Sequence, residues 1–136
     1  MALEDRVRVD GQELLLNGAA LRTRVIFKVY VAGLYLPAKA TTAQSVLEAK
    51  GAKRILLVMV RDAAAQQFVE STEAGMRANN MLDYAPSEGG TTLFVDGVAQ
   101  GRPMPGEAFY QALLRIWLGD DPVQVDLKEA LLGGVQ

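Results

Sequence analysis

The stretch that decides the fold is RTRVIFKVYVAGLYL, residues 22–36. It is dense in Val, Ile, Phe and Tyr, the residue types that favour strands. Its density of apolar residues predicts one long strand that is buried on both faces for part of its length. Pro37 follows directly and cannot donate a ladder hydrogen bond, so the strand is expected to end at Leu36.

Two shorter strands are expected before this stretch. Val7 and Val9 alternate with charged residues, which is the pattern of a half-buried strand. The chain then turns into the largely apolar residues 13–16. Asn17-Gly18 follows, and this dipeptide is typical of a tight turn between strands. The sequence therefore predicts a chain reversal at this dipeptide.

Two further strand signals lie downstream. Residues 55–60, ILLVMV, form a continuous apolar run of strand length, which predicts a central strand. Residues 91–95 and 98–100 flank Asp96-Gly97. Because this dipeptide favours the two-residue turn whose twist matches paired strands, the two segments are expected to form a hairpin.

Helices are predicted where capping residues precede apolar positions that recur every three or four residues. The first predicted helix follows Thr41-Thr42 and ends before Gly51. The second begins at a cap on Asp62 and is expected to run to about Asn80, with its apolar face on the sheet.

Two more helices complete the pattern. The third opens at residues 105–107, and its apolar stripe is expected to be Phe109, Leu113, Ile116 and Trp117. Asp126 is expected to cap a last short helix over residues 127–132. The sequence shows no internal repeat and no linker, so residues 1–136 are predicted to form one α+β domain. We expect a mostly antiparallel sheet with helices on one face.

The composition excludes several classes of function. The 136 residues contain no Cys and no His, which removes thiol nucleophiles, imidazole bases and almost every transition-metal site. Asp120-Asp121 lies between a glycine and a proline, which favours a solvated turn over a metal site. The net charge of −2, with interspersed signs, gives no basic surface for nucleic acid. We therefore expect neither metal, cofactor nor nucleic-acid partner.

The sequence also bears on membranes and compartment. No apolar run approaches the ~18 residues that a membrane-spanning helix needs, so we expect no membrane span. Residues 1–5, MALED, lack the basic flank and apolar core of a secretion signal. The compartment stays open: periplasmic if a signal peptide was trimmed, otherwise cytoplasmic.

Several segments resemble the chalcone isomerase-like superfamily, in particular its bacterial branch. They occur in family order as LNGAALR (residues 16–22), FKVYVAGLYL (27–36), QQF (66–68) and IWLGDDP (116–122), continuing to residues 131–133. The resemblance implies an open-faced β-sandwich, in which a large antiparallel sheet carries a layer of helices and a ligand cleft lies between them. The family includes a plant enzyme that closes a chalcone to a flavanone and non-catalytic relatives that bind fatty acids. Fold alone therefore does not choose the function.

The resemblance also indicates candidate site residues. Arg22 matches the arginine that is central in the plant enzyme, where a permanent planar charge suits a carboxylate, a phenolate or an enolate. Tyr30 stands at the position of a threonine that helps to orient the substrate. Phe68 stands at the position of a tyrosine and lacks its hydroxyl. The expected ligand-binding set is Arg22, Tyr30 and Phe68, and catalysis would depend on Arg22 and Tyr30.

Each of these residues also has a purely structural interpretation. Arg22 is equally consistent with a strand-end arginine paired with Glu13 or with solvent. Tyr30 fits a core aromatic whose hydroxyl reaches the edge of the core. Phe68 is expected to pack on the apolar face of a helix in both interpretations.

One joint departs from the family pattern. Family members usually carry another helical segment before the strand near Leu82, whereas here Asn80 runs almost directly into Met81. Uncovered apolar surface at this joint would favour a homodimer or the exchange of an element between chains.

Three functions stay open. The chain is expected to be a non-catalytic domain that binds a fatty acid or a similar amphiphilic carboxylate. The alternatives are a chalcone isomerase-type lyase and a shortened or engineered scaffold without a ligand. The hydroxyl that Phe68 lacks favours the binding domain.

Overall fold

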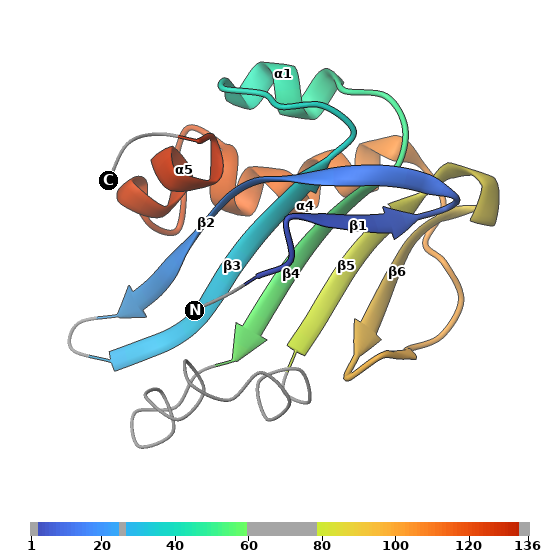
Figure 1. Cartoon of the computed structure of the whole chain (residues 1–136), viewed down its shortest axis with the longest axis horizontal. Helices are drawn as coiled ribbons and strands as arrows, with labels where there is room; N and C mark the ends of the chain where they lie inside the picture. The colour runs from blue at the N-terminus through green and yellow to red at the C-terminus, as the bar shows by residue number, and fades with distance from the viewer. Residues whose placement is uncertain (1–2, 25–26, 60–78, 134–136) are drawn as a thin grey trace.

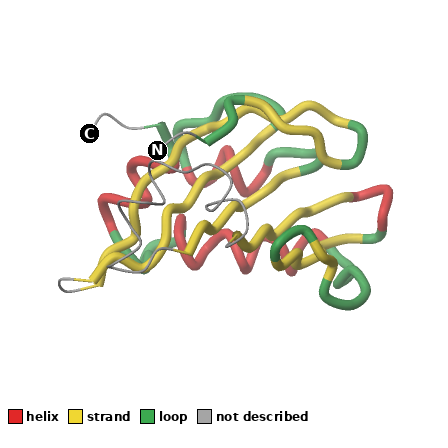
Figure 2. The backbone as a smooth tube through the Cα atoms, turned by 60° about the horizontal axis from the view of Figure 1, so that its bottom comes forward, coloured by secondary structure: helices red, strands yellow, loops and turns green. Residues whose placement is uncertain are grey.

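The computed structural model describes residues 3–24, 27–59 and 79–133. These residues form one curled antiparallel sheet of seven strands in sequence order (Figures 1 and 2). The strands are β1 (Arg6–Val9), β2 (Gln12–Arg24), β3 (Phe27–Leu36), β4 (Lys53–Met59), β5 (Asn79–Ala85), β6 (Gly90–Val95) and β7 (Val98–Ala99). The described helical segments are α1 (Ala43–Glu48), the 3-10 turn η1 (Pro86–Glu88), α4 (Glu107–Leu118) and α5 (Val125–Leu131).

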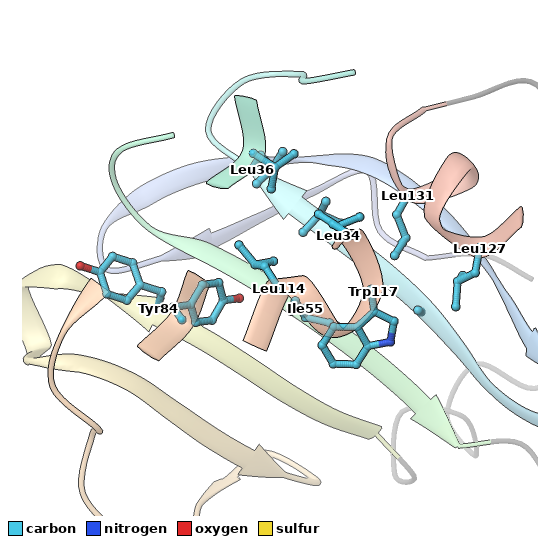
Figure 3. Close-up of a cluster of buried hydrophobic side chains, with 12 residues drawn as sticks. Leu34, Leu36, Ile55, Tyr84, Leu114, Trp117, Leu127 and Leu131 are labelled. Atoms are coloured by element: carbon cyan, nitrogen blue, oxygen red, sulfur yellow. The ribbon is translucent and has the colours of Figure 1, made fainter. Parts of the chain in front are cut away.

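The described α-helices pack on one face of the sheet. Val46 of α1, Leu114 of α4 and Leu127 of α5 share a buried cluster with strand residues such as Leu34 and Ile55. Figure 1 shows α4 passing behind the central strands, and Figure 3 shows this cluster between helices and sheet. The predicted α+β class, an antiparallel sheet with helices on one face, is confirmed.

The β1–β2 hairpin folds across the opposite face, and in Figure 1 β1 passes in front of the central strands. Val9 and Leu14 of this hairpin pack against Tyr35, Ala52 and Ala85. Hydrogen bonds fasten it there, from Tyr35 Oη to Glu4 O (2.8 Å), from Ala52 N to Gln12 Oε1 (3.0 Å) and from Ser87 N to Asp10 Oδ2 (3.0 Å).

The predicted turn at Asn17-Gly18 is wrong. β2 continues through both residues, and its register against β3 shifts between Leu16 and Gly18, so Asn17 is the extra residue of a β-bulge. The cause is tertiary, because the buried Asn17 amide donates to the carbonyl oxygens of Ala40 and Leu131.

The single strand predicted over residues 22–36 is also wrong, because two strands cover this stretch. Arg24, the last residue of β2, pairs with Phe27, the first residue of β3, so the chain reverses between them. The intervening Val25-Ile26 contains none of the residues that signal turns. The predicted end at Leu36, before Pro37, is confirmed.

Several local predictions are confirmed. The Thr42 hydroxyl caps α1 by accepting a hydrogen bond from Ser45 N at 3.1 Å. The run at residues 55–60 belongs to β4, a central strand of the sheet, through Met59. Asp96 and Gly97 have φ values of 51° and 85°, as the predicted turn between β6 and β7 requires.

Residues 62–78 of the helix predicted from Asp62 lie outside the described residues. Its predicted end is wrong, because Asn79 and Asn80 belong to β5. Asn80 pairs with Leu57 on one side and with Val95 on the other, so its place in the sheet is set by both neighbouring strands.

The buried stripe of α4 differs from the prediction by one residue for most of its length. Trp117 is buried as expected, but Phe109 and Ile116 are 38% and 43% exposed. Tyr110 is buried instead of Phe109, and its hydroxyl donates to Leu82 O at 2.7 Å. The buried side chains of this helix are Tyr110, Leu114, Trp117 and Leu118, with Leu113 half buried.

Helix α5 begins earlier than predicted. Gln124 occupies the N-cap position, so Asp126 is not the cap. Asp126 lies in the first turn, where its carboxylate accepts a hydrogen bond from Leu127 N at 3.1 Å and favours the helix N-terminus.

Candidate functional site

The candidate site lies on the helix-covered face, at the end of the sheet where β2 meets β3. Arg22 of β2 is the cross-strand partner of Tyr30 of β3. Opposite positions in an antiparallel pair share a face of the sheet. Tyr30 packs against the cluster that the helices cover, so this is the face that both positions share. For Arg22 the structure describes this backbone position alone.

Tyr30 is held by the tryptophan of α4. Trp117 Nε1 donates a hydrogen bond to Tyr30 Oη at 2.9 Å. Trp117 is 6% exposed and belongs to the core cluster, whereas Tyr30 is half buried at its edge. In Figure 3 Trp117 and Tyr84 lie toward opposite ends of this cluster. The bond therefore ties the end of α4 to the site end of β3.

The loop between α4 and α5 closes against the same end of β2. Gln124 Nε2 donates to the carbonyl oxygen of Leu21, the residue before Arg22, at 3.2 Å. Val123 N donates to Ile116 O at 3.0 Å, which holds the loop to the last turns of α4. Ile116 and Val123 are both partly exposed, so apolar side chains accompany this loop.

Beyond Tyr30 the helix-covered face is apolar. Ala32 and Leu34 follow Tyr30 on the same side of β3 and are fully buried in the cluster. Ala20 and Leu57, the cross-strand partners of Ala32, are only half buried, and Leu113 of α4 is half buried against the same cluster. The end of this face thus combines polar positions with apolar surface that is not fully covered.

A second polar row crosses the far end of the same face. Lys53, Tyr84 and Thr91 are successive cross-strand partners on β4, β5 and β6. Lys53 is 1% exposed, with Nζ 5.1 Å from the centre of the Tyr84 ring and 3.4 Å from Gly51 O. Burial lowers the pKa of Lys53, and the Glu107 carboxylate opposes that shift. Apolar rows separate these residues from Tyr30, so they do not belong to the same site.

Among the described residues, the most buried ion pair lies on the opposite face, under the β1–β2 hairpin. Arg54 binds Asp83 through two hydrogen bonds of 2.8 and 2.9 Å, and the two side chains are 17% and 7% exposed. Tyr35 is the cross-strand partner of Arg54, and burial raises the pKa of Tyr35 to about 12. This group holds the hairpin side of the sheet and does not face Tyr30.

The described residues contain neither a metal-binding cluster nor a membrane-spanning helix. No group of three or more acidic residues among them is arranged to hold a metal ion. Asp120 and Asp121 are exposed, as a solvated turn requires. None of the described helices combines the length and apolar character that crossing a membrane demands.

The sequence-based site is thus placed in part. The structure brings the strand positions of Arg22 and Tyr30 together, while Phe68 lies outside the described residues. The alternative pairing of Arg22 with Glu13 fails, because Glu13 lies near the other end of β2 and pairs with Arg6 at 3.0 Å.

Two contacts at this end of the sheet were not predicted from the sequence. Trp117 was expected only to pack in the core, and no contact was predicted for Gln124. The need of a buried indole N–H for an acceptor was the available signal for Trp117, but it does not say which acceptor.

Comparisons with known proteins agree with this architecture. A family model described as chalcone isomerase-like matches residues 1–86 and 79–133. No curated protein sequence matches. Among solved structures, a fatty-acid binding protein of Arabidopsis thaliana is similar, with a TM-score of 0.56 and 14% identity over 96% of this chain and 88% of that chain. That likeness shows the shared fold, and the family match covers nearly the whole length: the chain belongs to the chalcone isomerase-like family.

Proposed function

We propose that this chain is a non-catalytic binding domain for a fatty acid or a similar amphiphilic carboxylate. The head group binds at Arg22 and Tyr30, and the tail lies against the apolar end of the helix-covered face. The observation that carries the proposal is the direct cross-strand pairing of Arg22 with Tyr30 at the end of that face.

The chemistry of this pair suits a carboxylate. A guanidinium is permanently charged and presents its donors in a planar fork that matches two carboxylate oxygens. A phenol supplies one further O–H donor. The similar Arabidopsis protein is a fatty-acid binding protein, which supports the same ligand class here.

The surroundings suit the tail. Half-buried Ala20 and Leu57 flank Ala32, two residues from Tyr30 on the same side of β3. Each methylene removed from water there contributes about 0.8 kcal/mol. Apolar contact alone does little to fix direction, so the head group determines orientation.

Titration of dodecanoate and hexadecanoate against the wild type and Arg22→Ala tests the proposal. Loss of a charge-assisted contact should weaken binding about 10- to 100-fold. Arg22→Lys should restore only part of the affinity, because an ammonium lacks the planar fork. Arg102→Ala, which removes an exposed arginine away from β2, is the matched control and should bind as the wild type does.

Thermal unfolding of each variant separates binding from folding. We expect Arg22→Ala to unfold near the wild-type temperature. Equal affinity in all four proteins would contradict the proposal and make Arg22 a surface charge. A collapse of stability in Arg22→Ala would instead give it a structural role.

A further inference from the structure

The hydrogen bond between Trp117 and Tyr30 has an unambiguous direction. An indole nitrogen can only donate, whereas a phenolic oxygen can both donate and accept. Since Trp117 Nε1 lies 2.9 Å from Tyr30 Oη, the tyrosine oxygen is the acceptor. Because the Tyr30 oxygen accepts this bond, the Tyr30 O–H is left to donate to another group.

The packing of Trp117 makes this arrangement persistent. The residue is 6% exposed and lies in the cluster with Leu114 and Leu127, so the indole cannot turn away without opening the core. A buried indole that loses its acceptor would also leave its N–H unpaired, at a cost comparable to a lost hydrogen bond. The core therefore holds the indole N–H against the Tyr30 oxygen.

The consequence concerns the character of the head-group site. With its oxygen occupied by the indole, Tyr30 offers a donor to a ligand. The position opposite Tyr30 is Arg22, and a guanidinium has donors and no acceptor. These two residues together favour a head group that accepts hydrogen bonds and penalise one that must donate.

We propose that Trp117 is a positioning residue that turns Tyr30 into a hydrogen-bond donor and thereby sets the selectivity of the site for carboxylates over alcohols of the same chain length. This inference rests on the proposed function, because it concerns how the same site distinguishes head groups. Trp117 acts through Tyr30 and does not touch the head group.

The bond itself can be tested without a ligand. Trp117 is the sole tryptophan among the 136 residues, so the protein gives one indole N–H signal in an NMR spectrum. Tyr30→Phe should shift that signal and speed its exchange with solvent by at least tenfold. Tyr110→Phe, which removes the hydroxyl bound to Leu82 O in the same cluster, is the matched control and should leave the signal in place. An unchanged signal in Tyr30→Phe would overturn the inference.

The selectivity is tested by titrating dodecanoate and dodecanol against the wild type and Trp117→Phe. The substitution keeps an aromatic ring in the core and removes the N–H, which frees the Tyr30 oxygen to accept from an alcohol. We expect the ratio of dodecanoate to dodecanol affinity to fall about five- to tenfold. This is the effect of one hydrogen bond that the site no longer makes in favour of the carboxylate. Tyr110→Phe should keep the wild-type ratio.

The outcomes separate this inference from the function on which it rests. Equal weakening of both ligands in Trp117→Phe, with the ratio unchanged, would show that the indole only packs and would overturn the inference alone. Failure of the wild-type protein to bind either ligand would overturn the proposed function and the inference with it. A narrowed ratio at a preserved unfolding temperature supports both.

Discussion

The side-chain amide of Asn17 lies 2.7 Å from the carbonyl oxygen of Leu131, 114 residues later in the chain. The same side chain donates to Ala40 O and accepts from Ala40 N, both at 2.8 Å. One buried asparagine thus joins the bulge of β2, the loop after β3 and the end of α5. The neighbouring Gly18 is also constrained, because a Cβ there would lie 2.0 Å from Ala130 O.

Asn17→Ala should therefore lower the free energy of unfolding by about 3 kcal/mol, because it leaves buried backbone groups without partners. Denaturant unfolding followed by circular dichroism measures the loss. Gln44→Ala removes an exposed side-chain hydrogen bond to Glu48 and should change stability by less than about 0.5 kcal/mol. Equal stability of the two variants would contradict the role given to Asn17.

The ion pair between Arg54 and Asp83 gives a second prediction. Asp83→Asn removes one charge of a nearly buried bidentate pair, and the uncompensated guanidinium should destabilise the fold by about 3 kcal/mol. The double variant Arg54→Met/Asp83→Leu should recover most of that loss, since it removes both charges. The comparison uses urea unfolding at neutral pH. A double variant less stable than Asp83→Asn would show that the attraction between the two charges exceeds the free-energy cost of desolvating them.

The raised pKa of Tyr35 predicts a loss of stability at alkaline pH. Its pKa is raised to about 12 in the folded state by burial, against about 10 for an unfolded chain. The folded protein therefore keeps this proton where the unfolded chain has lost it, and the stabilisation present below pH 10 disappears as the pH rises through 12. In urea titrations from pH 9 to 11.5, the wild type should lose stability more steeply than Tyr35→Phe. Parallel curves for the two proteins would contradict this prediction.

Features governed by local signals could be predicted from the sequence. The cap on Thr42, the turn at Asp96-Gly97 and the break at Pro37 each depend on residues within a few positions of one another. The predictions that were wrong concern residues held by partners far away in the sequence. Asn17 has the sequence of a turn and forms a bulge, because it is held by a residue near the other end of the chain.

The candidate site follows the same division. The family resemblance drew attention to Arg22 and Tyr30, but their direct pairing requires the chain to reverse between Arg24 and Phe27, which no turn residue announces. Trp117 was correctly assigned to the core from its helical spacing. Its bond to Tyr30 depends on how α4 is rotated on the sheet. The helix buries Tyr110 rather than Phe109, and apolar periodicity does not distinguish these two rotations.

Self-association stays a prediction, and the structure gives it a surface. The β6–β7 end exposes Leu93, Val98 and Met104, with Val98 62% and Met104 51% accessible. Val98 lies on the edge strand β7, and an exposed apolar side chain at a sheet edge favours pairing between chains. Sedimentation should show a concentration-dependent dimer that Val98→Asp weakens, whereas Val125→Asp, a control at an exposed site on α5, leaves it unchanged. Monomer alone at high micromolar concentration would contradict the prediction.

The last prediction concerns catalysis. The family resemblance implies that ring closure of a chalcone uses a hydroxyl where this chain has Phe68 and a threonine where it has Tyr30. Loss of one preorganised donor costs about 100- to 1000-fold in rate, and here the threonine is replaced as well. We therefore expect chalcone to cyclise at its uncatalysed rate in the presence of the wild-type protein, as followed by its visible absorbance. Phe68→Tyr should add little, because the second position remains altered. Saturable turnover by the wild type that disappears in Arg22→Ala would establish an isomerase and refute a purely binding role.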